Sequence, residues 1–411
     1  MGNAISYAFG LAAIVSAASA CGGRAGGRDA GGRDADVPPC SPDVGLVAPL
    51  PECTVDDPCT RIAPELPQAP IVSASDPPSC ADARWDETWT TTLGGTTRYA
   101  CVFRAAGASP SSRRPLVIWF HPGGEGADNG ETETHLLDKA ETFDLASDAS
   151  RLGYTLVVPQ GRNLHWPPLA PRDGRHHDFY HRDLASPSGN PDVAFADAII
   201  DAIVAEGIVD PERIHVMGWS NGGFFGQLYA IARHVTRTPG GSRIASAAVF
   251  ATGDPFENIR WDPFAHVPYG GSPSCRLATY PASDVPILLV RRTCDAATPC
   301  GTSDDACFVG EPGHATGTWL AAAAAAGITG ITNLTIRGLE LGAAGTDQVA
   351  SGCSDVASAC DTASCSERPN SVGCLCLVNH LRWPDGDYAN GVGVDQEPTM
   401  LGFLRDHPLA P

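Results

Sequence analysis

The sequence predicts an α/β fold in which a mostly parallel central sheet is flanked by helices. Two patterns between residues 85 and 411 lead to this prediction. Short apolar or β-branched runs alternate with segments whose apolar residues recur at helical spacing, which is typical of strand–helix–strand repeats. Several runs are apolar throughout, as expected of strands that are buried on both faces. With 43% apolar and 18% charged residues among 411, the chain can bury a full-sized core.

The predicted elements run from an N-terminal hairpin to a C-terminal helix. Leu93-Gly94-Gly95 separates two β-prone runs and predicts the hairpin turn. Asn190 and Pro191 predict a helix start, because asparagine caps helices and proline suits their first turn. The expected strands are 85–92, 98–104, 116–120, 154–158, 213–217, 247–251, 287–290 and 334–341, and the expected helices are 190–203, 222–233, 318–326 and 396–406.

The N-terminus has the pattern of a secretory signal. Residues 8–20 form an apolar run that ends in small residues just before Cys21 and is too short to span a membrane. A small-residue triplet followed by cysteine resembles a bacterial lipoprotein cleavage site, with Cys21 as the lipidated residue. The alternative is an ordinary secretory signal cut near the same place. We therefore expect residues 1–21 to be a signal peptide, and the protein to be secreted or attached to the cell envelope.

Beyond this signal, the composition divides the chain into two parts. Residues 22–84 begin with a Gly-Arg repeat that has no apolar residue to bury, and they continue as a Pro- and Cys-rich stretch. We expect a flexible tether followed by an irregular lead-in. Residues 85–411 are expected to form the main domain.

Cysteine content and net charge restrict the compartment and the partners. Fifteen cysteines without zinc-type spacing favour an oxidising compartment and disulfides, including disulfides within a Cys-rich insertion at 353–376. Lipidation of Cys21 would leave fourteen, an even number. The formal charge of −20, from 27 basic and 47 acidic residues, argues against nucleic acid as a partner. We expect a monomer that contacts a membrane only through an N-terminal lipid anchor.

Gly218-Trp219-Ser220-Asn221-Gly222 has the pattern G-x-S-x-G and lies between a predicted strand and a predicted helix. This is the context of a nucleophile elbow, a strained turn in which glycines allow close backbone approach and the serine oxygen is lifted out of the sheet. The backbone N–H of Asn221 would point toward an oxyanion from a helix start, where the dipole favours negative charge. The alternative is a Gly-rich turn without chemistry. We predict Ser220 as the nucleophile.

A second oxyanion donor is expected in the loop after an early strand. His121-Pro122-Gly123-Gly124 follows the predicted strand that ends at Phe120. Proline has no N–H, so Gly123 or Gly124 must donate the second hydrogen bond. We expect His121 to be a structural loop residue rather than a base.

The acid of a catalytic triad is expected after the serine, at the C-terminal edge of the sheet. Asp295 follows the apolar run 287–290 by a few residues, and we predict that it orients the histidine. Asp304 and Asp305 are the alternatives. The non-catalytic interpretation of Asp295 is a turn-forming aspartate beside a disulfide.

Three histidines follow Asp295, and one of them has the placement of a catalytic base. His407 lies among the last residues, and His314 precedes a helix that should cover the flank of the sheet. His380 follows the apolar run 374–379, which predicts a last strand. A histidine on the loop beyond that strand can reach the serine with the aspartate on its far side. We predict His380 as the base, with His314 as the alternative.

A histidine-rich stretch could hold a metal ion. His176, His177, Asp178 and His181 lie close together in the sequence, but their spacing matches no zinc pattern well. We expect a polar loop bordering the substrate cleft and no metal site.

These residues resemble a known family. The helix that starts at Asn190, the segment 209–214 and the motif around Ser220 are similar to those of the polyhydroxybutyrate depolymerase and feruloyl esterase group, a secreted carbohydrate-esterase-like branch of the α/β hydrolases. Residues 157–161 resemble the family's Tyr-Pro-Asp-Gly segment, and 292–295 its Gly-Thr-x-Asp segment. Residues 380–384 resemble its His-x-Trp-Pro motif with one extra residue. The resemblance spans 85–407 without the Cys-rich insertion, and it implies an α/β-hydrolase fold and ester hydrolysis.

The sequence therefore predicts a secreted serine esterase that uses Ser220, His380 and Asp295 and needs no metal or organic cofactor. The substrate would be a feruloyl- or acetyl-polysaccharide or a hydroxyalkanoate ester, including polymers. Trp219 and Trp383 could offer flat apolar walls to the acyl chain, with ordinary packing as the alternative. A peptidase of the same fold and an inactive surface-binding protein on this scaffold are the competing interpretations.

Overall fold

The structure is a computed structural model, and it describes residues 80, 82–165, 173–179, 187–234, 243–256, 261–262, 267–268, 282–292, 295, 316–341, 347–349, 378–386 and 394–409. Several predictions fall outside these residues. They are the signal peptide with Cys21, the tether and most of the lead-in, the insertion at 353–376, and the side chains of His181, Asp304, Asp305 and His314.

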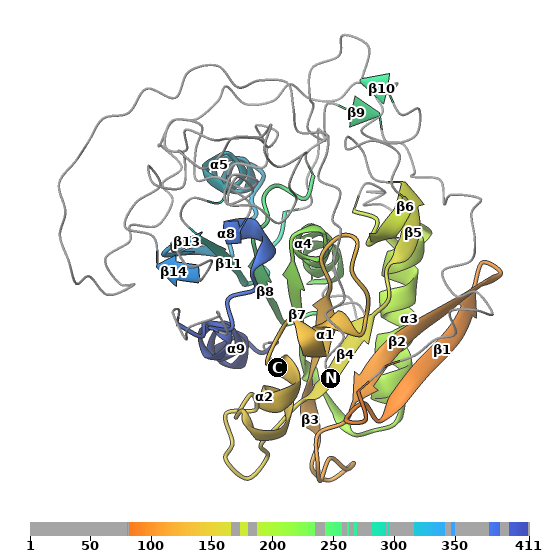
Figure 1. Cartoon of the computed structure of the whole chain (residues 1–411). Coiled ribbons are helices and arrows are strands. Elements are labelled where there is room, and N and C mark those ends of the chain that lie inside the picture. The colour runs from red at the N-terminus through yellow and green to blue at the C-terminus, as the bar shows by residue number, and fades with distance from the viewer. Residues whose placement is uncertain are drawn as a thin grey trace, which may run out of the picture.

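An eight-stranded sheet lies at the centre of the described structure, in the order β1-β2-β4-β3-β7-β8-β11-β12 (Figure 1). The β1–β2 and β2–β4 pairs are antiparallel, and the remaining five pairs are parallel. The predicted mostly parallel sheet is confirmed. Its strands are β1 Glu87–Leu93, β2 Thr96–Phe103, β3 Arg114–Phe120, β4 Thr155–Pro159, β7 Val209–Trp219, β8 Ser246–Phe250, β11 Ile287–Arg292 and β12 Ile331–Ile336.

The central strands are the apolar runs of the sequence. Every residue of β3, β4, β8 and β11 is buried, because helices cover both faces of the parallel part of the sheet. The hairpin turn at Gly94-Gly95 also occurs as predicted, and both glycines have positive φ, which residues with a side chain rarely adopt.

Helices pack against the sheet in two layers. The core on one face joins it to α3 (Pro191–Ala205), α4 (Asn221–His234) and α5 (Thr316–Ala325). The core on the other face joins it to α2 (Leu136–Thr142) and α9 (Glu397–Asp406). Asn190 caps α3 as predicted, since its side chain accepts from the N–H groups of Asp192 and Val193.

The structure differs from the predictions mainly in short elements. The expected strand 334–341 is two strands, β12 and β13 (Leu339–Leu341), and β13 pairs with β14 (Asp347–Val349) in a separate ribbon. The expected strand before His380 is wrong at its end, where α8 (Val378–Leu381) is helical. The short elements α2 and β14 had no sequence prediction, and the same holds for α1 (Asn129–Thr132), η3 (Pro187–Gly189), β5 (Arg162–His165), β6 (Asp173–His176), β9 (Trp261–Asp262) and β10 (Val267–Pro268).

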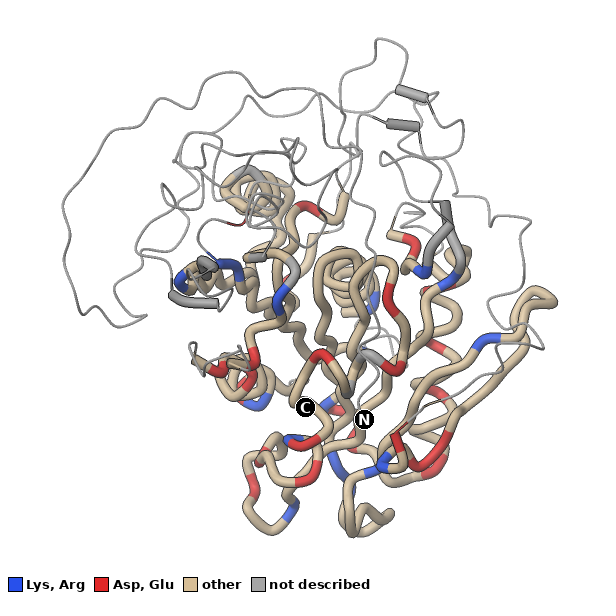
Figure 2. The backbone as a smooth tube through the Cα atoms, viewed as in Figure 1, with Lys and Arg blue, Asp and Glu red and all other residues tan. Residues whose placement is uncertain are grey.

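This topology is that of the α/β-hydrolase fold. An antiparallel hairpin precedes a parallel sheet in which β3 and β4 are exchanged relative to their chain order, and the fifth strand of the eight, β7, leads directly into α4. Charged residues of both signs lie along the described chain (Figure 2). None of the described helices is both long enough and apolar enough to cross a bilayer.

Candidate active site

Ser220 lies in a tight turn between β7 and α4. Its φ is 51°, a strained value for a residue with a side chain. A Cβ atom on Gly218 would lie 2.4 Å from the carbonyl oxygen of Gly222, and one on Gly222 would lie 2.1 Å from that of Phe120. Both positions therefore require glycine, which is why the G-x-S-x-G spacing gives this turn. The Ser220 N–H donates to the Phe250 carbonyl at 3.0 Å and ties the turn to β8.

Three of the predicted side chains form one chain of hydrogen bonds. The Oγ of Ser220 lies 2.7 Å from Nε2 of His380, and Nδ1 of His380 lies 3.2 Å from Oδ2 of Asp295. Asp295 is fully buried, and the side chain of His380 is 12% exposed. An imidazole between a carboxylate and a hydroxyl can take the hydroxyl proton on one nitrogen while the other stays bonded to the carboxylate.

Strand ends and a short helix position the two partners of Ser220. Asp295 lies three residues beyond the end of β11, at the C-terminal edge of the sheet. His380 lies in the short helix α8, so the predicted loop after a strand is wrong at this position. The indole N–H of Trp219 donates to the His380 carbonyl at 2.8 Å, and the Arg292 guanidinium donates to the carbonyls of Arg382 and Trp383. These long-range bonds to the backbone hold the histidine over the turn.

The prediction that Trp219 and Trp383 form substrate walls is wrong for this structure. Each residue is only 2% exposed, and their rings pack against each other with centroids 6.0 Å apart. The indole N–H of Trp383 donates to Glu397 at 2.6 Å. Both side chains therefore pack beneath the histidine, which was the alternative interpretation of the sequence.

The two loops that were predicted to supply oxyanion donors lie side by side. A Cβ atom on Gly123 would lie 3.5 Å from Cβ of Asn221. The Gly124 N–H donates to the Arg175 carbonyl at 2.8 Å, so this group is already used. Within the described residues, neither the N–H of Gly123 nor that of Asn221 has an acceptor. This geometry favours Gly123 over Gly124 as the second oxyanion donor beside Asn221.

His121 is fully buried and bonded on both ring nitrogens. Its Nε2 accepts from the Gly161 N–H at 2.9 Å, and its Nδ1 lies 2.7 Å from the Pro122 carbonyl, which requires a proton on Nδ1. Burial lowers the pKa of His121 to about 4. The ring is therefore neutral near pH 7 and has no lone pair left to act as a base.

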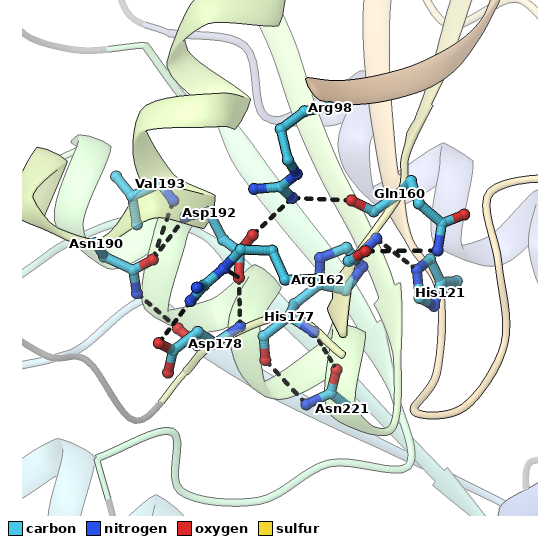
Figure 3. Close-up of polar contacts among 11 residues, drawn as sticks. Arg98, His121, Gln160, Arg162, His177, Asp178, Asn190, Asp192, Val193 and Asn221 are labelled. Atoms are coloured by element: carbon cyan, nitrogen blue, oxygen red, sulfur yellow. Dashed lines mark hydrogen bonds and ion pairs between the residues drawn. The ribbon is translucent and has the colours of Figure 1, made fainter. Parts of the chain in front are cut away.

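The expected polar loop at His176, His177 and Asp178 is the end of β6 and the residues after it, and these side chains are buried. These residues are 6%, 1% and 0% exposed, and they lie against the serine turn and the His121 loop. Asp178 accepts from Arg162, which also contacts Asp192 of α3 (Figure 3).

The sequence contains one sign of this buried network. Arg98 is a charged residue in a β-prone run, and where such a side chain is buried it needs an anion beside it. Asp192 provides that anion at 2.7 Å, from a position 94 residues away.

One group of possible metal ligands occurs among the described residues. Ligand atoms of His135, Asp395 and Glu397 lie within 4.8 Å of one another. The ammonium of Lys139 lies 2.7 Å from Asp395 and 2.6 Å from Glu397, so a side-chain cation already bridges the two carboxylates. This group fits an ion pair better than a metal site.

Comparisons with known proteins give only distant similarities. No family model matches the chain, and no curated protein matches it. Among solved structures, a thermostable esterase is 15% identical with a TM-score of 0.34, and the match covers 61% of this chain and 54% of that one. The dipeptidyl peptidase 4 of Porphyromonas gingivalis is 16% identical with a TM-score of 0.36, over 62% and 32% of the two chains.

A third similar structure is the poly(3-hydroxybutyrate) depolymerase LpqC from Bordetella parapertussis. It is 17% identical with a TM-score of 0.34, and the match covers 61% of this chain and 83% of LpqC. The chain spans about half of the esterase and a third of the peptidase named above. The assignment of the chain to the α/β-hydrolase fold therefore rests on its own strand order and on the turn at Ser220.

Proposed function

We propose that the protein is a serine hydrolase that cleaves carboxylic esters through an acyl-enzyme. The observation that carries this proposal is the hydrogen-bonded chain from Ser220 through His380 to the buried Asp295. It starts at a strained serine on a strand-to-helix turn, the placement that an exposed nucleophile needs.

In the acylation step, Oγ of Ser220 attacks the ester carbonyl carbon while Nε2 of His380 takes the hydroxyl proton. The carbonyl π electrons move to the oxygen, and the N–H groups of Gly123 and Asn221 stabilise the resulting negative charge. Asp295 keeps the proton of His380 on Nδ1 and stabilises the imidazolium. When the tetrahedral intermediate collapses, the C–O bond to the alcohol breaks and His380 gives its proton to the leaving oxygen.

In the deacylation step, water replaces the alcohol. His380 takes a proton from the water, whose oxygen attacks the acyl carbon, and the same two N–H groups hold the second oxyanion. Collapse breaks the bond to Ser220, which regains its proton from His380 and releases a carboxylic acid. These steps use side chains, backbone and water alone.

For the substrate class we propose feruloyl or acetyl esters of polysaccharides, or hydroxyalkanoate esters. This choice is supported by the sequence resemblance around Ser220, whereas cleavage of amides is the alternative on the same scaffold. A screen of p-nitrophenyl acetate, methyl ferulate, acetylated xylan and poly(3-hydroxybutyrate), with a chromogenic peptide beside them, would rank these classes.

The Ser220→Ala variant tests the chemistry. We expect its turnover of p-nitrophenyl acetate to fall by about 10⁴-fold or more while its thermal unfolding midpoint stays near that of the wild type. A fluorophosphonate probe should label the wild type and fail to label the variant. Retained turnover would remove Ser220 from the mechanism, and a wild type that neither turns over nor takes the label would favour an inactive binding protein.

A further inference from the structure

The side chain of Asn221 forms its hydrogen bonds with the backbone of another part of the chain. It is buried, and its Oδ1 accepts from the N–H of His177 at 2.8 Å while its Nδ2 donates to the carbonyl of the same residue at 3.1 Å (Figure 3). A peptide N–H needs an acceptor and a carbonyl needs a donor, so this two-point contact fixes the orientation of the amide. Asn221, whose backbone N–H is a proposed oxyanion donor, is therefore bonded through its side chain to the backbone of His177.

The other oxyanion loop contacts the same part of the chain, which we call the 175–178 segment. The Gly124 N–H donates to the Arg175 carbonyl at 2.8 Å. A Cβ atom on Gly123 would lie 2.7 Å from Nδ1 of the His176 ring, so this loop lies directly against the segment. The 175–178 segment therefore contacts both loops that supply the proposed donors.

A buried ionic network fixes the 175–178 segment in turn. The Asp178 N–H donates to Asp192 at 2.7 Å, and the Asp178 carboxylate accepts from Arg162 at 2.9 Å. Arg162 and Arg98 both contact Asp192, at 3.3 and 2.7 Å (Figure 3). These four side chains are at most 3% exposed. Burial would raise the pKa of Asp192, but the two guanidinium groups hold it well below its usual range, so the carboxylate stays charged.

We propose that Asn221 is a positioning residue whose side chain sets the geometry of the oxyanion hole. Its two bonds to His177 hold the first residue of α4 against the 175–178 segment, which also holds the Gly123 loop, and so they set the distance between the two donor N–H groups. This inference rests on the proposed function. Oxyanion donors act only when they are aimed at the developing charge, and a misplacement of about 1 Å costs about 10²-fold in rate.

The test is the variant Asn221→Ala, which keeps the backbone N–H and removes only the side-chain amide. We expect kcat for p-nitrophenyl acetate to fall about 10- to 100-fold and KM to change less than about threefold. The matched control is Gln227→Ala, which removes a buried amide from the same helix. Gln227 donates to the Gly253 carbonyl at 2.9 Å and accepts from the Trp319 indole at 2.9 Å.

A second measurement distinguishes loss of oxyanion positioning from a general loss of rigidity in the variant protein. A trifluoromethyl ketone forms a hemiketal oxyanion on the serine, so its affinity should fall in Asn221→Ala by the same factor as kcat/KM and should stay near the wild-type value in Gln227→Ala. If Asn221→Ala does not fold, Asn221→Ser supplies a smaller polar residue for the same comparison, with thermal unfolding as the check on folding.

Two results would overturn the proposal. One is an Asn221 variant with wild-type kcat, and the other is an equal loss of kcat in the Asn221 and Gln227 variants. Either result, obtained with an active wild type, leaves the proposed esterase function intact. A wild type that is inactive on esters and unlabelled by a fluorophosphonate would instead remove the proposed function itself.

Discussion

The two sides of Ser220 are held in place by different interactions. On the oxyanion side, buried charged groups hold the structure together. Asp192 lies between two arginines and accepts a hydrogen bond from the backbone of Asp178. On the histidine side, aromatic rings form most of the packing, and the Arg292 guanidinium donates to the carbonyls of Arg382 and Trp383. The Trp219 indole holds the carbonyl of His380, and the rings of Trp119, Trp219, Phe250 and Trp383 pack together beneath it.

This difference matches what each side does in the proposed reaction. The oxyanion donors must stay fixed while charge forms in front of them, and buried ionic bonds give a rigid support. The imidazole must accept and return a proton, so only its backbone is firmly held, and its ring contacts Ser220 and Asp295. Rigidity is therefore placed where the geometry must stay constant during turnover.

The largest expected effect tests the ionic side. Asp192→Asn removes the charge that two buried guanidinium groups share, and we expect the free energy of unfolding to fall by about 3–5 kcal/mol. Urea unfolding followed by tryptophan fluorescence measures this loss.

The control for that variant is an ion pair of similar length that is more exposed to solvent. Arg104 lies 2.6 Å from Glu206, but their side chains are 24% and 33% exposed. Glu206→Gln should cost less than about 1 kcal/mol, because water screens the pair. Equal losses in the two variants would mean that burial does not distinguish the network from surface charge.

The next effect is the pH dependence of stability. Burial lowers the pKa of His121 to about 4 and that of His177 well below its usual range, whereas histidines in the unfolded chain titrate near about 6.5. Between these values the unfolded state binds more protons. Stability should therefore be complete above about pH 6.5 and fall as the pH drops toward 4, by about 3 kcal/mol for His121 alone.

Urea unfolding at pH 7.5 and 4.5 gives this difference directly. His121→Asn carries no titratable ring and should show a shallower loss between the two pH values than the wild type. The same slope in both proteins would show that His121 titrates normally in the folded state.

The smallest effect tests the histidine side. Trp383→Phe keeps an aromatic ring in the cluster but removes the indole N–H that donates to Glu397. Glu397 retains its bonds to Lys139 and to the backbone of His135, so we expect a loss of only about 2 kcal/mol. A loss as large as that of Asp192→Asn would show that the two sides are held equally strongly.

Patterns among neighbouring residues predicted those parts of the fold that depend on short-range interactions. Continuous apolar runs became β3 and β4, Asn190 became a helix cap, and the glycines around Ser220 became the tight turn. The order of Ser220, Asp295 and His380 along the chain, together with the expected strand ends, predicted that the aspartate and the histidine lie near the serine.

The parts that escaped prediction depend on distant contacts. The strands β5 and β6 are four residues long and polar, so no alternation of apolar residues marks them. The α8 helix is a single turn; Trp219 holds its backbone from 161 positions away, and Arg292 holds the residue after it, Arg382, from 90 positions away. Partner choice at such separations cannot be read from neighbouring residues.

The end of β11 supports both the acid and the base, since Asp295 follows it closely and Arg292 holds the backbone beside His380. The 85 positions that separate Asp295 from His380 therefore need not set the distance between them. A change of length between two elements of that stretch should therefore leave the Asp295–His380 bond intact, provided that α5, β12 and the end of β11 keep their places in the fold.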